Sequence, residues 1–234
     1  MKRHEASLFA GDADVPARER LRVFLLLIAA GGFLGAYTYV LKGGVFCNAQ
    51  TANCLLFAVR LGQGEWGRAL YYLIPISAYL GGAVLAALLP RYVERAGGLP
   101  FDALFVLFEM AALFALGFVP DDAPPQICQV AVNFLASMQF ATFRQARRVP
   151  MATTFCTNHI RQAGTHLVGW LRDRDADARM RFLMHAAMIL AFVAGALAGT
   201  LLCGRFQGRA IWWAELPLAL VLFDLLREAR RGRA

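Results

Sequence analysis

The chain has 234 residues, of which 59% are hydrophobic and 17% charged, and its mean hydropathy is +0.50. Soluble domains contain about 45–50% apolar and about 25% charged residues, so this composition is typical of a membrane protein. The net charge of +8 does not indicate nucleic-acid binding, because the Arg residues cluster beside apolar segments and form no single basic stripe.

The chain is predicted to form one domain over residues 1–234, because no linker rich in Pro, Ser or Gly divides it. Residues 1–21 are a polar segment that we expect in the cytoplasm. Five Cys residues occur without a CxxC pair, so the sequence predicts no metal site and no disulfide framework. No sequence motif indicates a cofactor.

Six apolar segments follow, and each is long enough to cross about 30 Å of hydrocarbon as a helix. The sequence therefore predicts an all-α integral membrane bundle. The six predicted spans are approximately 22–41, 69–90, 101–119, 126–143, 182–203 and 210–226.

The distribution of basic residues supports this number of spans. With the amino terminus in the cytoplasm, 19 of the 24 Lys and Arg residues fall on the cytoplasmic side. Cytoplasmic loops of membrane proteins carry such an excess of positive charge. We therefore expect a multi-pass protein of the cytoplasmic membrane with both termini inside the cell.

The two halves of the chain resemble each other, about 22–119 in the first and about 126–227 in the second. The motif Ala78–Ala83 matches Ala191–Ala196, and Gly82 corresponds to Gly195. Three spans is an odd number, so consecutive copies enter the membrane from opposite sides. The sequence thus predicts two inverted three-span repeats, a layout common in transporters.

Each half also contains a polar interruption followed by a short helical pattern. Residues 45–50 and 149–156 are predicted to descend to the bilayer centre as extended chain, and residues 52–64 and 158–171 to return as half-helices. Thr51 or Asn53, and Thr157 or Asn158, are the expected N-caps. The alternative is a pair of interfacial helices that lie flat on the two membrane surfaces.

Re-entrant half-helices would direct their free N–H groups at a polar ligand near the midplane. The predicted substrate-binding residues are Asn48, Gln50, Thr51, Asn53, Thr157, Asn158 and His159. Glu109, near the middle of its span, and its repeat counterpart Glu215 are the candidates for proton coupling. For both acids a structural hydrogen-bonding role is the alternative. His159 could sense pH, and His185 is expected at the membrane interface.

The segments GGFLGAYTYVLKGGVFCNAQTAN and MQFATFRQARRVPMATTFCTNHIR resemble the two signature regions of the YoaK family of bacterial membrane proteins. That resemblance implies about six spans and a domain of unknown function. Family members resemble each other most in a Thr-Gly-Asn triplet in each half. Here the triplets read Thr51-Ala52-Asn53 and Thr157-Asn158-His159, so both glycines and the second Asn are replaced.

These patterns favour a transporter or channel for a small polar or anionic solute or ion, embedded in the lipid bilayer and able to form a homo-oligomer. The main alternative is a membrane scaffold, assembly factor or signalling protein that transports nothing. An enzyme is not indicated, because the residues supply no recognisable nucleophile, base and orienting group.

Overall fold

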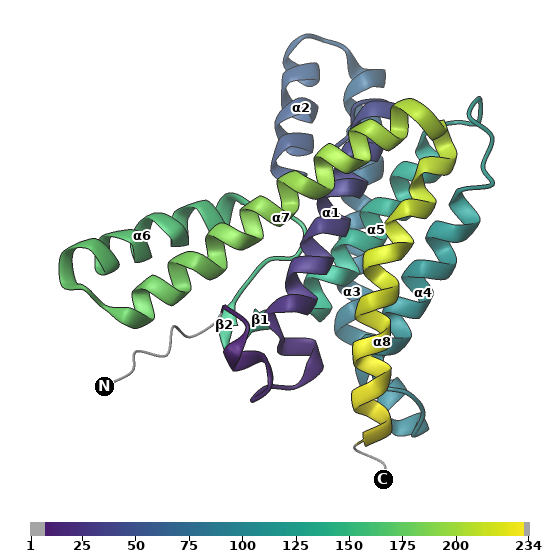
Figure 1. Ribbon diagram of the computed structural model, residues 1–234. Helices are drawn as coiled ribbons and strands as arrows, with labels where there is room; N and C mark the ends of the chain where they lie inside the picture. Colours follow the sequence, from purple (N-terminus) through teal and green to yellow (C-terminus); the bar gives the residue numbers. More distant parts are fainter. Residues whose placement is uncertain (1–7, 232–234) are drawn as a thin grey trace, which may run out of the picture.

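The computed structural model describes residues 8–231, and this part of the chain is almost entirely helical (Figure 1). Two strands of two residues each, β1 (Gln145–Ala146) and β2 (Val149–Pro150), pair as an antiparallel hairpin. The remaining elements are helices: η1 (Ala10–Asp12), η2 (Ala17–Glu19), α1 (Leu21–Leu41), α2 (Gln50–Gly62), α3 (Trp66–Ala96), α4 (Phe101–Leu116), α5 (Gln126–Thr142), α6 (Thr157–Asp173), α7 (Ala176–Phe206), η3 (Gln207–Ala214) and α8 (Glu215–Arg231).

The six predicted apolar segments are all helical, with boundaries close to those expected. The largest differences are the end of α3, six residues beyond the predicted 90, and the start of α7, six residues before the predicted 182. In the last segment, residues 207–214 form the 3-10 helix η3 before α8 begins. The two short helices predicted after the polar interruptions are present as α2 and α6, which begin two and one residues earlier than the sequence suggested.

The long helices run alternately in opposite directions. Figure 1 shows α1, α4 and α7 rising and α3, α5 and α8 descending. The start of α1 and the end of α8 therefore lie at the same end of the bundle. Helix α1 is the most enclosed of the candidate spans. In its most apolar stretch 67% of the residues are buried inside the structure, compared with 17% in α3. The core of the bundle is therefore built around α1.

The helices pack as two pairs, with α1 along α7 and α3 along α5. Glycine makes each approach close enough for backbones to touch. A Cβ at Gly195 would overlap the carbonyl oxygen of Ala29 in α1, and a Cβ at Gly82 would overlap that of Phe134 in α5. Small residues at such crossings are the usual way for membrane helices to associate. The matched glycines of the two halves thus occupy corresponding contacts.

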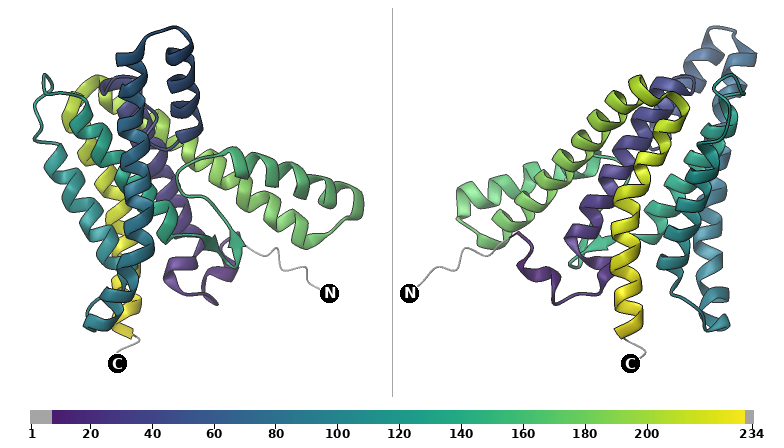
Figure 2. Two further views of the ribbon diagram at one scale, coloured as in Figure 1. Left: turned by 180° about the vertical axis from the view of Figure 1, so that it is seen from behind. Right: turned by 45° about the vertical axis from the view of Figure 1, so that its right-hand side comes forward.

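The short helices α2 and α6 form hairpins with the helices that follow them, and both hairpins extend away from this core. Helix α2 packs on α3, and α6 packs on α7. Figure 2 shows the α2–α3 pair projecting beyond one end of the bundle, while α6 and the first half of α7 project sideways. The two hairpins therefore leave the centre of the bundle in different directions.

Three helical segments are long and apolar enough to cross a membrane: Leu21–Leu41, Trp66–Val93 and the continuous stretch Ala176–Arg231. Helices α4 and α5 have 16 and 17 residues. At about 1.5 Å per residue they measure roughly 25 Å, slightly less than the hydrocarbon thickness of about 30 Å. The composition and these helices indicate a membrane protein.

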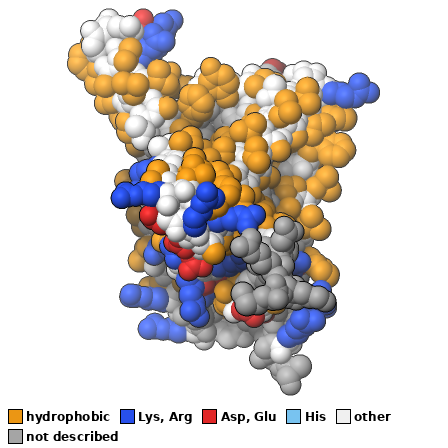
Figure 3. Space-filling model, turned by 60° about the vertical axis from the view of Figure 1, so that its left-hand side comes forward, with side chains coloured by type: hydrophobic (Ala, Val, Ile, Leu, Met, Phe, Trp, Pro, Cys, Tyr) orange, Lys and Arg blue, Asp and Glu red, His pale blue; other side chains and the backbone are white. Residues whose placement is uncertain are grey.

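The surface is divided by polarity. On the face drawn in Figure 3, hydrophobic side chains cover most of the upper part, and Lys and Arg gather over the lower part. Exposed apolar residues of α3 and α7 include Leu80, Leu88, Leu190 and Leu201, each more than half exposed. Exposed apolar area of this extent in a monomer marks an interaction surface, which for these helices fits lipid.

Candidate functional site

The two non-helical segments that precede α2 and α6 meet at the middle of α1. Asn48 donates a hydrogen bond from Nδ2 to the carbonyl oxygen of Gly31, with a length of 3.2 Å. Thr153, in the other segment, places its carbonyl oxygen 2.8 Å from the position that a Cβ of Gly31 would occupy. Gly31 is the central residue of α1, so both segments reach the same turn halfway along this helix.

On the side of the first segment, buried amides form a continuous chain of hydrogen bonds. Asn53 donates to the carbonyl oxygen of Phe46 (2.9 Å) and to Oε1 of Gln50 (3.0 Å). Gln50 in turn donates to Oδ1 of Asn133 at 2.7 Å, which links α2 to α5. The chain continues through Gln129, which bonds to Tyr71 and to the carbonyl oxygen of Lys42.

On the side of the second segment, the contacts are made by an amide and two imidazoles. Gln139 donates to the carbonyl oxygens of Thr153 (3.2 Å) and Leu27 (3.3 Å), which fastens the segment to α1 and α5. His159 bonds through Nε2 to the carbonyl oxygen of Ala152 (2.8 Å) and through Nδ1 to Nδ1 of His185 (2.9 Å). Both imidazoles are fully buried.

A tyrosine from α3 joins the two segments. The Tyr79 hydroxyl faces Thr154 of the second segment and lies near Cys47 of the first. Cys47 and Thr154 are both almost completely buried. The meeting point of the segments is therefore enclosed by α1, α3 and α5.

Several polar atoms around this point have no hydrogen-bond partner within residues 8–231. They are the buried side-chain atoms Asn53 Oδ1, Ser137 Oγ, Thr153 Oγ1 and Thr154 Oγ1. An unpaired buried polar atom costs about 1–3 kcal/mol, and such atoms in a native protein indicate a bound water or ligand. Buried polar atoms without a hydrogen-bond partner in the described chain therefore lie around the centre of α1.

The predicted site residues divide into an inner and an outer set. Asn48, Asn53 and His159 are buried, and Gln50 is half-buried within the amide chain. Thr51 and Thr157 are exposed and Asn158 is half-buried, where it accepts a hydrogen bond from Arg161 (3.0 Å). The structure brings the inner set to the segments that meet at Gly31, but Thr51 and Thr157 point elsewhere.

The predicted N-caps of the half-helices are wrong. Helix α2 begins at Gln50 after Ala49, and α6 begins at Thr157 after Cys156; neither end is capped by a side-chain hydrogen bond. The Thr and Asn side chains that were expected to cap are already helical residues. The first turns contain no acidic residue, so their N–H groups keep a partial positive charge.

The two candidate acids lie in the packed helices α4 and α8. Glu109 is fully buried in the middle of α4, and neither carboxyl oxygen has a hydrogen-bond partner within the described chain. Glu215, the first residue of α8, is half-buried and close enough to interact electrostatically with Glu109. The two acids therefore lie close together, but no contact joins them to the segments at Gly31.

Several contributors could not be recognised from the sequence. Thr153 and Thr154 belong to a polar stretch that gave no sign of which residues would be buried. Gln139 and Asn133 form hydrogen bonds between helices. His185 was expected at the membrane interface, but it is buried against His159. Only the pairing of α6 with α7 brings the two imidazoles together, and this pairing cannot be read from sequence spacing.

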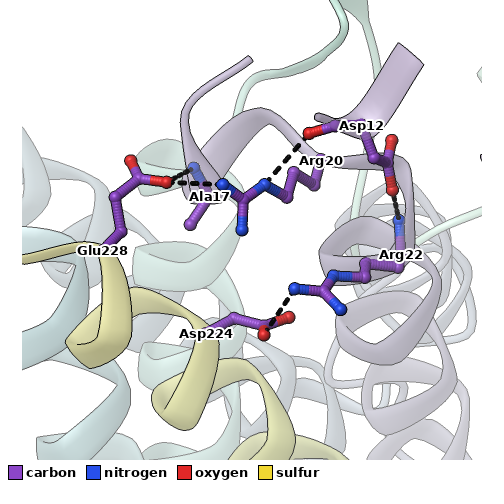
Figure 4. A network of polar contacts seen from close by, with 6 residues as sticks. All are labelled: Asp12, Ala17, Arg20, Arg22, Asp224 and Glu228. Carbon is purple, nitrogen blue, oxygen red and sulfur yellow. Dashed lines mark hydrogen bonds and ion pairs between the residues drawn. The ribbon is translucent and has the colours of Figure 1, made fainter. Parts of the chain in front are cut away.

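A separate polar network lies at the end of the bundle where α1 begins and α8 ends (Figure 4). Arg20 bonds to Glu228 (2.8 Å), and Arg22 bonds to Asp224 (2.6 Å). Asp12 accepts the backbone N–H groups of Leu21 and Arg22, so it caps the start of α1. These residues line a cavity of about 640 Å³ that is open to solvent and far along α1 from Gly31.

A family model described as "Protein of unknown function (DUF1275)" matches residues 23–223. The chain belongs to the DUF1275 family. The match covers both halves of the bundle, including the segments that meet at Gly31, but it does not carry the name YoaK. No curated protein and no solved structure is significantly similar to the chain. Within residues 8–231, no group of three or more His, Cys, Asp or Glu side chains could hold a metal ion.

Proposed function

We propose that this DUF1275 protein is a transporter or channel for a small polar or anionic solute, with its binding site at the central turn of α1. The observation that carries the proposal is the meeting of two non-helical segments, from opposite halves of the chain, at Gly31. Non-helical backbone at membrane depth is tolerated only beside protein or a water-filled cavity. Interrupted helices of this kind form the midplane sites of many transporters.

The proposed arrangement is six spans in two inverted repeats, with α2 and α6 as re-entrant half-helices. Three features support it: the alternate direction of the long helices, the pairing of α1 with α7 and of α3 with α5, and the matched glycines at those crossings. The location proposed is a bacterial cytoplasmic membrane with both termini inside. The excess of Lys and Arg on that side and the ion pairs that join the two ends support this orientation.

The chemistry of the site favours a solute that can exchange hydrogen bonds. Amides and hydroxyls surround it, and several of their atoms are unpaired. The uncapped first turns of α2 and α6 favour an electron-rich or anionic group over a bare cation. Glu109 and Glu215 are proposed as proton-coupling groups, because a buried acid without a basic partner is most stable when it binds a proton.

Flux through reconstituted liposomes tests the proposal. Purified protein would be assayed with halides, nitrate, phosphate, small carboxylates and neutral polyols. Gly31→Ala inserts a methyl against the Thr153 carbonyl and Asn48→Ala removes the bond to Gly31, so each should lower flux by about tenfold or more. Gly81→Ala, where a Cβ meets open space, is the matched control. No flux for the whole panel, or equal flux in Gly31→Ala and Gly81→Ala, would refute the proposal.

A further inference from the structure

The contacts of His159 define which of its nitrogens carries a proton. Its Nε2 lies 2.8 Å from the carbonyl oxygen of Ala152, and a carbonyl oxygen can only accept, so Nε2 must be protonated. In a neutral imidazole the other nitrogen is then an acceptor. Nδ1 of His159 therefore accepts from Nδ1–H of His185, at 2.9 Å.

The same reasoning leaves one nitrogen of the pair without a proton. Because His185 donates through Nδ1, its Nε2 is an unprotonated acceptor when the ring is neutral. This atom is buried and has no hydrogen-bond partner in the described chain. The nitrogen is fully enclosed, so the ligand that fits it is a proton.

We propose that His159 and His185 form a proton-binding pair, in which one proton is taken up at Nε2 of His185 while the bond between the two Nδ1 atoms holds α6 on α7. The first proton leaves this bond intact, because it enters on the opposite side of the ring. A second proton on His159 would occupy the only acceptor of the bond and break it. The pair thus distinguishes one bound proton from two.

His166 packs against the pair from the solvent side of α6. Its ring is half-buried on α6 and stacks on that of His185, with centroids 5.9 Å apart and planes within 4°. Burial and the nearby Arg181 lower the pKa of His166, and Asp175 opposes this shift. The ring of His166 therefore covers one face of His185, and the described chain contains no hydrogen bond from it to Nε2 of His185.

The charges around His185 set the conditions for uptake. On α6 it faces His159, His166 and Arg161, and on its own helix it is close to Arg181. These groups are the neighbours that any charge on His185 would meet. The consequence reaches the proposed solute site, because His159 also holds Ala152, next to Thr153 at Gly31.

Imidazole nitrogen NMR of the full chain in nanodiscs tests the proton site without any solute, and the chain contains only four His residues. Near neutral pH we expect an Nε2–H form for His159 and an Nδ1–H form for His185, joined by a coupling across their hydrogen bond. On acidification Nε2 of His185 should gain a proton first, with that coupling retained. An Nε2–H form of His185 at neutral pH, or protonation of His159 first, would overturn the proposal.

Two variants complete the test. In His185→Asn the amide N–H replaces the Nδ1–H donor but cannot take up a proton, so the fold should persist while proton uptake in acid falls by one per chain. Thr165→Ala, an exposed α6 position whose hydroxyl donates to the Arg161 carbonyl oxygen, should titrate like the native protein. Unchanged uptake in His185→Asn would refute the proton site. Since these measurements need no solute, failed transport leaves them valid.

Discussion

Asn53 and His159 make the same contact in opposite halves of the chain. Each side chain donates to a backbone carbonyl seven residues earlier, Asn53 to Phe46 at 2.9 Å and His159 to Ala152 at 2.8 Å. Each contact fastens a non-helical segment to the first turn of the short helix that follows it. An amide and an imidazole nitrogen thus serve one structural purpose, so the Thr-x-Asn and Thr-x-His triplets are equivalent in geometry as well as in sequence.

Removing the Asn53 side chain should destabilise the protein. Asn53→Ala eliminates the donor to Phe46 and to Gln50 at a fully buried position. The free energy of unfolding in micelles should fall by roughly 1–3 kcal/mol, because the buried acceptors lose their partner. Cys54→Ala, at the exposed neighbouring position, is the control and should change it by less than about 0.5 kcal/mol. Equal stability of the two variants would mean that the Asn53 contacts contribute nothing.

Adjacent glycines in α3 should respond in opposite ways to alanine. Gly82→Ala would press its methyl into the Phe134 carbonyl of α5 and should cost about 1–3 kcal/mol of unfolding free energy. Gly81→Ala meets no atom within 4 Å and should be neutral or stabilising, by at most about 1 kcal/mol. Gly195→Ala should behave like Gly82→Ala, because it presses against the Ala29 carbonyl of α1. Thermal unfolding of the three purified variants measures the order, and an equal response of Gly81 and Gly82 would contradict it.

These glycines show how far the sequence alone could predict the fold. The match of Gly82 with Gly195 was visible in the motif Ala-x-x-Gly, and apolar length predicted the helical segments to within a few residues at most ends. The boundary at residues 207–214 was missed because a 3-10 helix has no distinct hydrophobic period. Pairing of α1 with α7 was also invisible, since nothing in the spacing of a uniformly apolar helix specifies its neighbour.

The burial of individual polar side chains was harder to predict than the position of the non-helical segments. The sequence predicted non-helical chain at residues 45–50 and 149–156, where polar residues interrupt apolar segments, and nearly all of both stretches is non-helical. It could not separate Asn53, which is buried, from Thr51, which is exposed, because both are small polar residues in the same helical turn. Burial at that scale depends on the helix on which α2 packs, and that helix is known only from the fold.

The hydrogen bond between Gln50 and Asn133 should couple α2 to α5 energetically. Its 2.7 Å length and buried acceptor predict an interaction energy of about 0.5–3 kcal/mol in a double-mutant cycle. The cycle compares Gln50→Ala, Asn133→Ala and the double variant by chemical unfolding. Gln63→Ala, on the exposed turn after α2, replaces Gln50→Ala in a control cycle that should show additivity. Additive effects in the test cycle would show that the bond does not join the helices.

The ion pairs of Arg20 with Glu228 and Arg22 with Asp224 hold the two ends of the described chain together, and the proposed topology predicts that both lie on one side of the membrane. In a Cys54→Ala background, which removes the exposed thiol, single cysteines would be placed at Asp14, Arg230 and Gln63. A membrane-impermeant maleimide added to intact cells should label Gln63→Cys, because the turn between α2 and α3 lies at the opposite end of the bundle (Figure 1). Asp14→Cys and Arg230→Cys should react only after the membrane is opened, since the excess of Arg at their end places it in the cytoplasm. Labelling of Asp14→Cys but not Arg230→Cys in intact cells would require an odd number of spans, and the proposed inverted repeats could not then both have three.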